Sequence, residues 1–214
     1  WSSDVCSSDL LRNTLQLGRG DGSWAEIAEY SGLAASEWTW SVAFLDVDLD
    51  GFEDVLVANG HPHDMVDSDA MRKLEAKQRG APRGSRDSGR TLFPALRTPN
   101  LAFRNGGDLR FTEVGETWGF NTPGVSQGLA LADLDNDGDL DVVLNNLNGT
   151  AGLYRNESIA PRVSVRLRGL APNTRGIGAR LTVRGGPVLE QTQEIQAGGR
   201  YLSGDDSMRT FAAG

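Results

Sequence analysis

Residues 46–54 read DVDLDGFED, and residues 133–141 read DLDNDGDLD. Both stretches carry aspartate at positions 1, 3, 5 and 9 and glycine at position 6. In a tight loop, alternate side chains can point to one centre, glycine permits the sharp turn, and the carbonyl of position 7 can supply a further oxygen. The spacing therefore predicts two cation-binding loops.

The predicted ligands come from positions 1, 3, 5, 7 and 9 of each loop. They are Asp46, Asp48, Asp50, Phe52 and Asp54 in the first loop and Asp133, Asp135, Asp137, Asp139 and Asp141 in the second. Carboxylates this close repel one another unless a cation lies among them. Calcium takes roughly 6 to 8 hard oxygen ligands, whereas zinc favours His or Cys and magnesium keeps several waters. We therefore expect two Ca²⁺ sites.

Two other readings of the loops compete with this one. An EF-hand shares positions 1, 3, 5 and 6, but it needs a bidentate glutamate at position 12 and a helix on each side. Position 12 is Val57 in one loop and Leu144 in the other, and the flanking residues 42–45 and 54–58 have strand-like composition. An acidic surface turn without metal is the second alternative, and the repetition of the full ligand spacing argues against it.

The two loops belong to a longer internal repeat. An offset of 87 residues brings residues 13–59 onto residues 100–146 without a gap, with Trp24 on Phe111. Each copy predicts a strand, a Gly-Asp turn, a second strand, a loop, and then one strand on either side of the acidic loop. Such a unit of about four strands is typical of a β-propeller blade.

The repeats predict an all-β protein organised as a partial β-propeller over residues 11–157. The two repeats cover residues 13–60 and 100–147, and a third copy begins at residues 152–156, where GLYRN echoes LAFRN of the second repeat. Propellers generally use about four to eight blades. We therefore expect the remaining blades upstream of residue 11 or on a partner.

The insertion at residues 61–99 separates the two repeats. It predicts a helix over residues 68–78, followed by a Gly/Pro/Arg-rich loop through Arg97. The arginines of this loop could meet an acidic ligand, although such a run is more often a solvated loop.

The ends of the chain differ from the repeats. Residues 158–214 predict a small β-rich domain, with alternating apolar residues at 163–167 and 181–183 and a further strand at 194–196. Residues 1–10, WSSDVCSSDL, look like translated sequencing adapter, and a disordered Ser-rich tail is the alternative. On the first reading the natural N-terminus and any export signal are missing, and Cys6 carries no chemistry.

Charge and hydropathy exclude several partners. The formal net charge is -8 with a pI near 4.8, which argues against a sequence-independent grip on nucleic acid or anionic membranes. No stretch approaches the roughly 18 apolar residues of a membrane span. Apart from Cys6 the chain has no cysteine, so we expect neither disulfides nor thiolate metal sites.

Other motifs give weaker signals. Arg19-Gly20-Asp21 spells an adhesion tripeptide, but the repeat aligns it with a plain hairpin turn. His61 and His63, with Asp64 and Asp67, could bind a transition metal, although a His-Pro-His stretch after a strand is more often only a loop.

Catalytic motifs are absent from the sequence, which lacks a G-x-S-x-G elbow and a P-loop. A glycosidase-like carboxylate pair stays open, because the chain has many carboxylates. We therefore expect a binding protein and not an enzyme.

The acidic loops resemble those of FG-GAP repeats, also called VCBS repeats, which occur in integrin α-subunit propellers and many secreted bacterial proteins. In that family the D-x-D-x-D-G-x-x-D loop binds calcium in a blade hairpin. Residues 158–214 resemble the ASPIC/UnbV domain through RGIGAR at 175–180, the E-x-x-x-G-G run at 194–199 and YLS at 201–203. The resemblance covers nearly everything after residue 11, and the insertion at 61–99 departs from it.

This resemblance implies a calcium-stabilised module outside the cytoplasm, either extracellular or periplasmic. Its expected role is adhesion, matrix contact or binding of a protein or glycan that the sequence does not identify. The alternative is an accessory calcium-stabilised part of a larger secreted enzyme, whose catalytic part lies elsewhere in the full-length protein.

Overall fold

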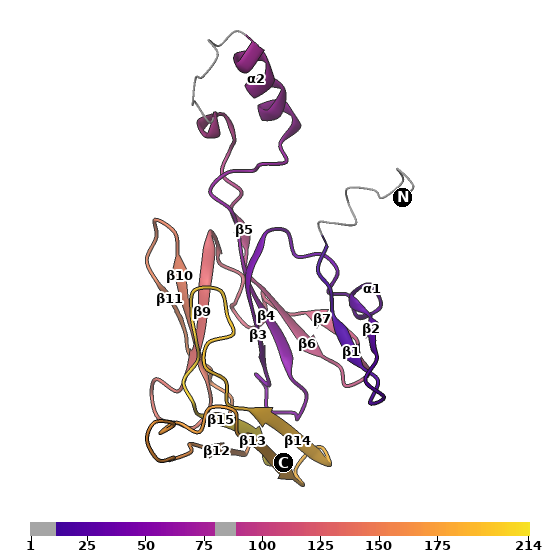
Figure 1. The fold of residues 1–214 in the computed structure, drawn as a ribbon, viewed down its shortest axis with the longest axis vertical. Coiled ribbons are helices and arrows are strands. Elements are labelled where there is room, and N and C mark those ends of the chain that lie inside the picture. Colours follow the sequence, from indigo (N-terminus) through magenta and orange to yellow (C-terminus); the bar gives the residue numbers. More distant parts are fainter. Residues whose placement is uncertain (1–11, 80–88) are drawn as a thin grey trace.

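The computed structural model describes residues 12–79 and 89–214, which form an almost entirely β structure (Figure 1). The strands are β1 (Gln16–Gly18), β2 (Trp24–Glu26), β3 (Thr39–Leu45), β4 (Asp54–Asn59), β5 (Thr98–Pro99), β6 (Leu101–Asn105), β7 (Phe111–Glu113), β8 (Pro123–Gly124), β9 (Ser126–Ala132), β10 (Asp141–Asn146), β11 (Gly152–Tyr154), β12 (Arg162–Val165), β13 (Arg180–Arg184), β14 (Glu190–Glu194) and β15 (Arg209–Ala212). The helical segments are α1 (Ala28–Ser31), α2 (Ser68–Arg79) and the 3-10 turn η2 (Arg90–Leu92).

Two antiparallel sheets carry the acidic loops. The first has the order β3-β4-β6-β7 and the second the order β11-β10-β9. The first acidic loop joins β3 to β4, and the second joins β9 to β10. Each loop is therefore the turn of a β-hairpin, as the sequence predicts.

The sheets are out of phase with the sequence repeat. The first sheet combines the last two strands of the first repeat with the first two strands of the second, and the insertion lies between β4 and β6. The first two strands of the first repeat, β1 and β2, pair only with each other. One sequence repeat thus contributes to two neighbouring sheets.

The buried strand β4 explains how the sheets pack. Successive side chains of a strand point to opposite faces, and Leu56 and Ala58 join the main core cluster with residues of the second sheet. Val55 and Val57 face the other way and pack with Leu33 from the first repeat. Because both faces of β4 are covered, the sheets stack on one another like propeller blades.

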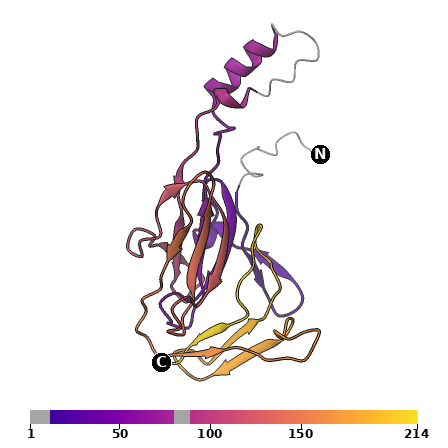
Figure 2. The same cartoon turned by 90° about the vertical axis from the view of Figure 1, so that its left-hand side faces the viewer.

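These observations confirm the all-β class and are consistent with a partial propeller. Within the described ranges no sheet closes on itself. The helix predicted over residues 68–78 is α2, which projects away from the sheets (Figures 1 and 2). Its N-terminus is capped by Asp67, whose Oδ1 accepts a hydrogen bond of 2.7 Å from the Ala70 N–H. Much of the Arg-rich loop after this helix, like residues 1–10, lies outside the described residues.

The C-terminal strands β12–β15 form two antiparallel pairs, β12-β15 and β13-β14. Figure 2 shows them lying across the ends of the sheets, on the side of the acidic loops. The strand predicted at residues 194–196 is wrong in position, because β14 covers Glu190–Glu194. Its sequence, EQTQE, is polar on both faces, so no apolar alternation marks it.

The loop between β14 and β15 returns along the inner edges of both sheets. Ser203 Oγ donates to the Leu129 carbonyl at 2.6 Å, and Arg200 donates to the Val42 carbonyl at 2.6 Å. Edge strands present unpaired backbone groups, and this loop satisfies several of them on β3 and β9. None of the helices in the described parts of the chain is long and apolar enough to cross a membrane.

Candidate metal centre

The two acidic loops have the same internal hydrogen bonds. At position 1, Asp46 accepts the N–H groups of Asp50 and Gly51 at 3.0 and 2.9 Å. Asp133 likewise accepts those of Asp137 and Gly138, each at 3.2 Å. A first-position carboxylate bound to two backbone donors fixes the turn of each loop.

The position 9 carboxylates tie the loops to the next strand. One oxygen of Asp54 accepts the Val47 N–H at 2.9 Å and the other accepts the Asn105 N–H at 2.8 Å. Asp141 accepts the equivalent bonds from Leu134 and Asn156, both at 2.8 Å.

Backbone conformation is also shared between the loops. Position 4 has positive φ, 57° at Leu49 and 62° at Asn136, and position 6 is glycine at 96° and 97°. Only glycine adopts the latter region without strain. The equivalence of the loops therefore extends from sequence to conformation.

The structure brings together three of the predicted ligands in each loop. One carboxylate oxygen from each of Asp46, Asp48 and Asp54 lies within 4.8 Å of the others, and the same holds for Asp133, Asp135 and Asp141. The position 5 aspartates are not part of these triads. Asp50 and Asp137 instead accept the N–H of the residue two positions later, at 3.0 and 3.1 Å.

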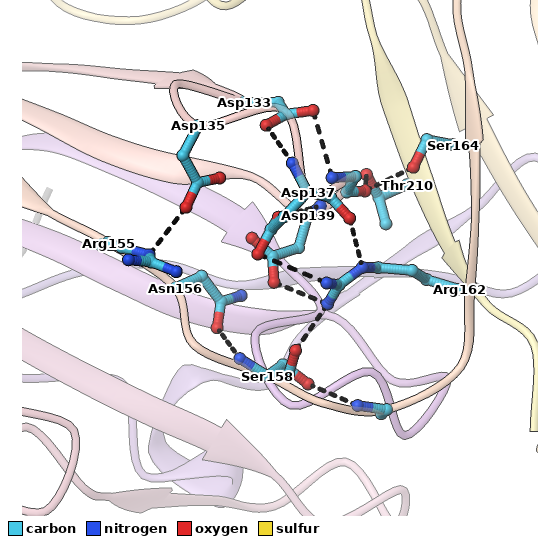
Figure 3. A network of polar contacts seen from close by, with 12 residues as sticks. Asp133, Asp135, Asp137, Asp139, Arg155, Asn156, Ser158, Arg162, Ser164 and Thr210 are labelled. Atoms are coloured by element: carbon cyan, nitrogen blue, oxygen red, sulfur yellow. Dashed lines mark hydrogen bonds and ion pairs between the residues drawn. The ribbon is translucent and has the colours of Figure 1, made fainter.

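Position 7 differs between the loops. The side chain of Phe52 is apolar and exposed, whereas Asp139 is buried. Burial raises the pKa of Asp139 to about 7, and the neighbouring Arg162 opposes this rise. Figure 3 shows Arg162 reaching the second loop from outside it.

An arginine on β6 and another directly after β11 neutralise part of each loop. Arg104 pairs with Asp48 at 2.6 Å and with Asp50 at 2.8 Å. Arg155 pairs with Asp135 at 2.7 Å. These arginines were not among the predicted site residues, although both lie in the repeated LAFRN and GLYRN motifs.

The donor set fits a hard divalent cation. Asp48 Oδ1 is buried and has no hydrogen-bond partner. Burial also raises the pKa of Asp46 to about 6 and that of Asp54 to about 7. Burial disfavours charged carboxylates unless a positive charge compensates them, and calcium accepts oxygen ligands of this kind.

The weaker candidates take structural roles. The Arg19-Gly20-Asp21 tripeptide lies in the turn between β1 and β2, where Asp21 Oδ1 accepts the Ser23 N–H at 2.9 Å. His61 packs against the rings of Trp38 and Trp40 and contacts the His63 carbonyl through Nδ1. Within residues 12–79 and 89–214, the acidic groups that converge on one point are those of the two loops, and neither group includes a histidine.

Comparison with known families finds a match to the FG-GAP-like repeat at residues 3–57 and 92–144, just over half of the chain. Both matched segments contain a complete acidic loop. Human (Homo sapiens) cartilage acidic protein 1 is 38% identical over 69 residues, which are 32% of this chain and 10% of that protein. The match thus spans about a tenth of the length of the human relative.

Proposed function

Because the chain belongs to the FG-GAP-like repeat family, we propose that it is a calcium-stabilised binding module of β-propeller type. The observation that carries the proposal is the equivalence of the two loops, each with three aspartates converging within 4.8 Å. Independent surface turns would not be expected to share ligand spacing, backbone conformation and hydrogen bonding.

The proposed ligands are the aspartates at positions 1, 3, 5 and 9 of each loop, with the backbone carbonyl at position 7. They are Asp46, Asp48, Asp50, Phe52 and Asp54 in one loop, and Asp133, Asp135, Asp137, Asp139 and Asp141 in the other. The position 5 aspartates now bind a backbone N–H and an arginine. Asp50 would join its site when the cation takes over from Arg104. Asp137, whose contact with Arg162 is longer, at 3.4 Å, would join its site and keep Arg162 beside it.

The role of calcium would be structural. It would offset the repulsion among buried carboxylates at the turn of each hairpin, and so hold the ends of both sheets. A ligand that binds only the folded state stabilises it by RT ln(1 + [Ca]/Kd), about 2.7 kcal/mol at a hundredfold excess over Kd.

For the whole protein we propose an extracellular or periplasmic role in binding a protein or glycan partner, as in adhesion or matrix contact. The family supports this proposal. We also assign residues 158–214 to an ASPIC/UnbV-like domain, supported by RGIGAR at 175–180 and by the change of strand pattern after β11.

Calcium titration by calorimetry tests the proposal. The full chain should bind two ions, and Asp48→Ala with Asp135→Ala should abolish binding. Asp108→Ala removes the same charge from a turn outside the loops, where Asp108 accepts the Arg110 N–H, and should leave the stoichiometry at two. Retained binding in the double variant, or an unchanged melting midpoint on adding a chelator, would refute structural calcium at these loops.

A further inference from the structure

The second acidic loop is held from outside by the C-terminal strands. Thr210 of β15 donates a hydrogen bond of 2.9 Å to the Gly138 carbonyl, and Ser164 of β12 donates to the same oxygen. Arg162 Nε donates to the Asp137 carbonyl at 3.1 Å. Two consecutive carbonyls of the loop are therefore fixed by residues of one strand pair.

Arg162 also binds loop side chains. Its Nη1 lies 2.7 Å from Asp139 Oδ2, and its Nη2 lies 3.4 Å from Asp137 Oδ2 (Figure 3). The side chains of Arg162 and Asp139 are 17% and 2% exposed. A carboxylate this deeply buried needs a positive partner, and a second bond, from Nη1 to the Ser158 carbonyl at 2.6 Å, orients the guanidinium group.

The first loop lacks this attachment. Its position 7 is Phe52, and its glycine, Gly51, faces the apolar side chains of Val188 and Pro187. Among the described residues, no hydrogen bond or salt bridge joins β12–β15 to residues 46–54. The two loops share their backbone conformation and internal hydrogen bonds but differ in what covers them.

We propose that docking of the C-terminal strands and cation binding favour each other at the second loop. The first loop binds its cation independently of the C-terminal strands. This inference rests on the calcium binding proposed above. Arg162, Ser164 and Thr210 act as positioning residues, because they fix the carbonyls before Asp139 and the Asp139 side chain. They thereby orient the Asp139 carbonyl, a proposed ligand.

The coupling must be reciprocal. If docking improves the affinity of the loop for the cation by some factor, the cation improves docking by the same factor. The C-terminal strands should therefore loosen when calcium is removed, although none of their residues is a proposed ligand.

Hydrogen exchange of the full chain, with calcium or with a chelator, measures this coupling. We expect the chelator to accelerate exchange of the β12 and β15 amides at least tenfold. In the charge-balanced double variant Arg162→Met/Asp139→Asn, that response should fall below twofold, while the β3–β4 amides beside the first loop keep theirs. The control variant Arg184→Met/Glu190→Gln also removes one ion pair from the C-terminal strands, but this 3.0 Å pair is exposed and does not involve the second loop. The β12 and β15 amides of the control should keep their full response to the chelator.

The outcomes separate the coupling from calcium binding. A calcium response at β9–β10 without one at β12 and β15 overturns the coupling and leaves calcium binding intact. No response in any strand overturns both. Thr210→Val provides a charge-neutral second measurement, in which the β12 and β15 response should shrink at least threefold. An undiminished response there and in the double variant overturns the positioning role.

Discussion

Arg104 Nε lies 2.6 Å from Asp48 Oδ2, so a guanidinium group occupies one carboxylate of the triad that we propose for calcium. The same side chain pairs with Asp50 at 2.8 Å, and the pairing with Asp48 raises the pKa of Arg104. A guanidinium group that pairs with a carboxylate of the triad stabilises the loop when no metal is bound, and it competes with a metal ion for that carboxylate.

Replacing Arg104 should separate these two effects. Arg104→Met is expected to lower the melting midpoint in chelator and to tighten calcium binding at one of two sites several-fold, a modest change because the arginine side chain is half exposed. Arg110→Met is the matched control, since Arg110 stacks over Tyr30 and makes no ion pair with the loop. Weaker calcium binding in Arg104→Met would show instead that the arginine orients Asp48 for the ion.

The raised pKa values of Asp46 and Asp54 predict a pH dependence. Burial raises them to about 6 and about 7, so the folded state binds these protons more tightly than the unfolded state does. Stability without calcium should therefore fall as the pH rises from about 4 to about 7. Calcium favours the charged carboxylates and should flatten this fall. Thermal melts at several pH values, with calcium or chelator, measure both trends, and a chelated protein that gains stability over this range would contradict the assignment.

The geometry of the acidic loops could be predicted from the sequence because it is determined locally. Glycine at position 6 and aspartates at positions 1, 3 and 9 determine the turn and the triads within nine residues. The partners of position 5 were not predictable in this way. Asp137 meets Arg162, 25 residues away and on a strand with no counterpart in the repeat.

Strand pairing shows the same limit. The offset of 87 residues aligns equivalent strands but does not say which strands share a sheet. Only the pairing of β4 with β6 shows that one sheet combines strands from both repeats. The helix α1 was expected to be a loop. It spans only four residues and ends at Gly32, whose φ of 81° closes the turn.

The core between the sheets makes a direct stability prediction. Leu129 of β9 is fully buried, whereas Leu153 of β11 is 69% exposed. Leu129→Ala should lower the free energy of unfolding by about 2–5 kcal/mol, because it leaves a cavity where the sheets meet. Leu153→Ala should change it by less than about 1 kcal/mol. Denaturant unfolding of both variants tests the packing, and similar effects would mean that the two sheets do not bury Leu129 between them.

Two equivalent asparagines should differ in their contribution to stability. The Asn156 side chain donates a hydrogen bond of 3.0 Å to the Val47 carbonyl, which lies in the first acidic loop, and so joins the second sheet to the first. The equivalent Asn105 side chain donates at 3.0 Å to the exposed Glu53 carbonyl within its own sheet. Water can replace the exposed bond more readily than the partly buried one.

We therefore expect Asn156→Ala to lower the free energy of unfolding by about 1–2 kcal/mol, and Asn105→Ala by about half as much or less. Asn156→Ala should also disturb the first loop, because the Val47 carbonyl loses its hydrogen-bond partner while the Val47 N–H binds Asp54. Calcium affinity at the first loop should then weaken, although Asn156 follows the strand beside the second loop. Calorimetry and denaturant unfolding of the two variants measure these effects, and equal losses would show that the tie between the sheets does not depend on Asn156.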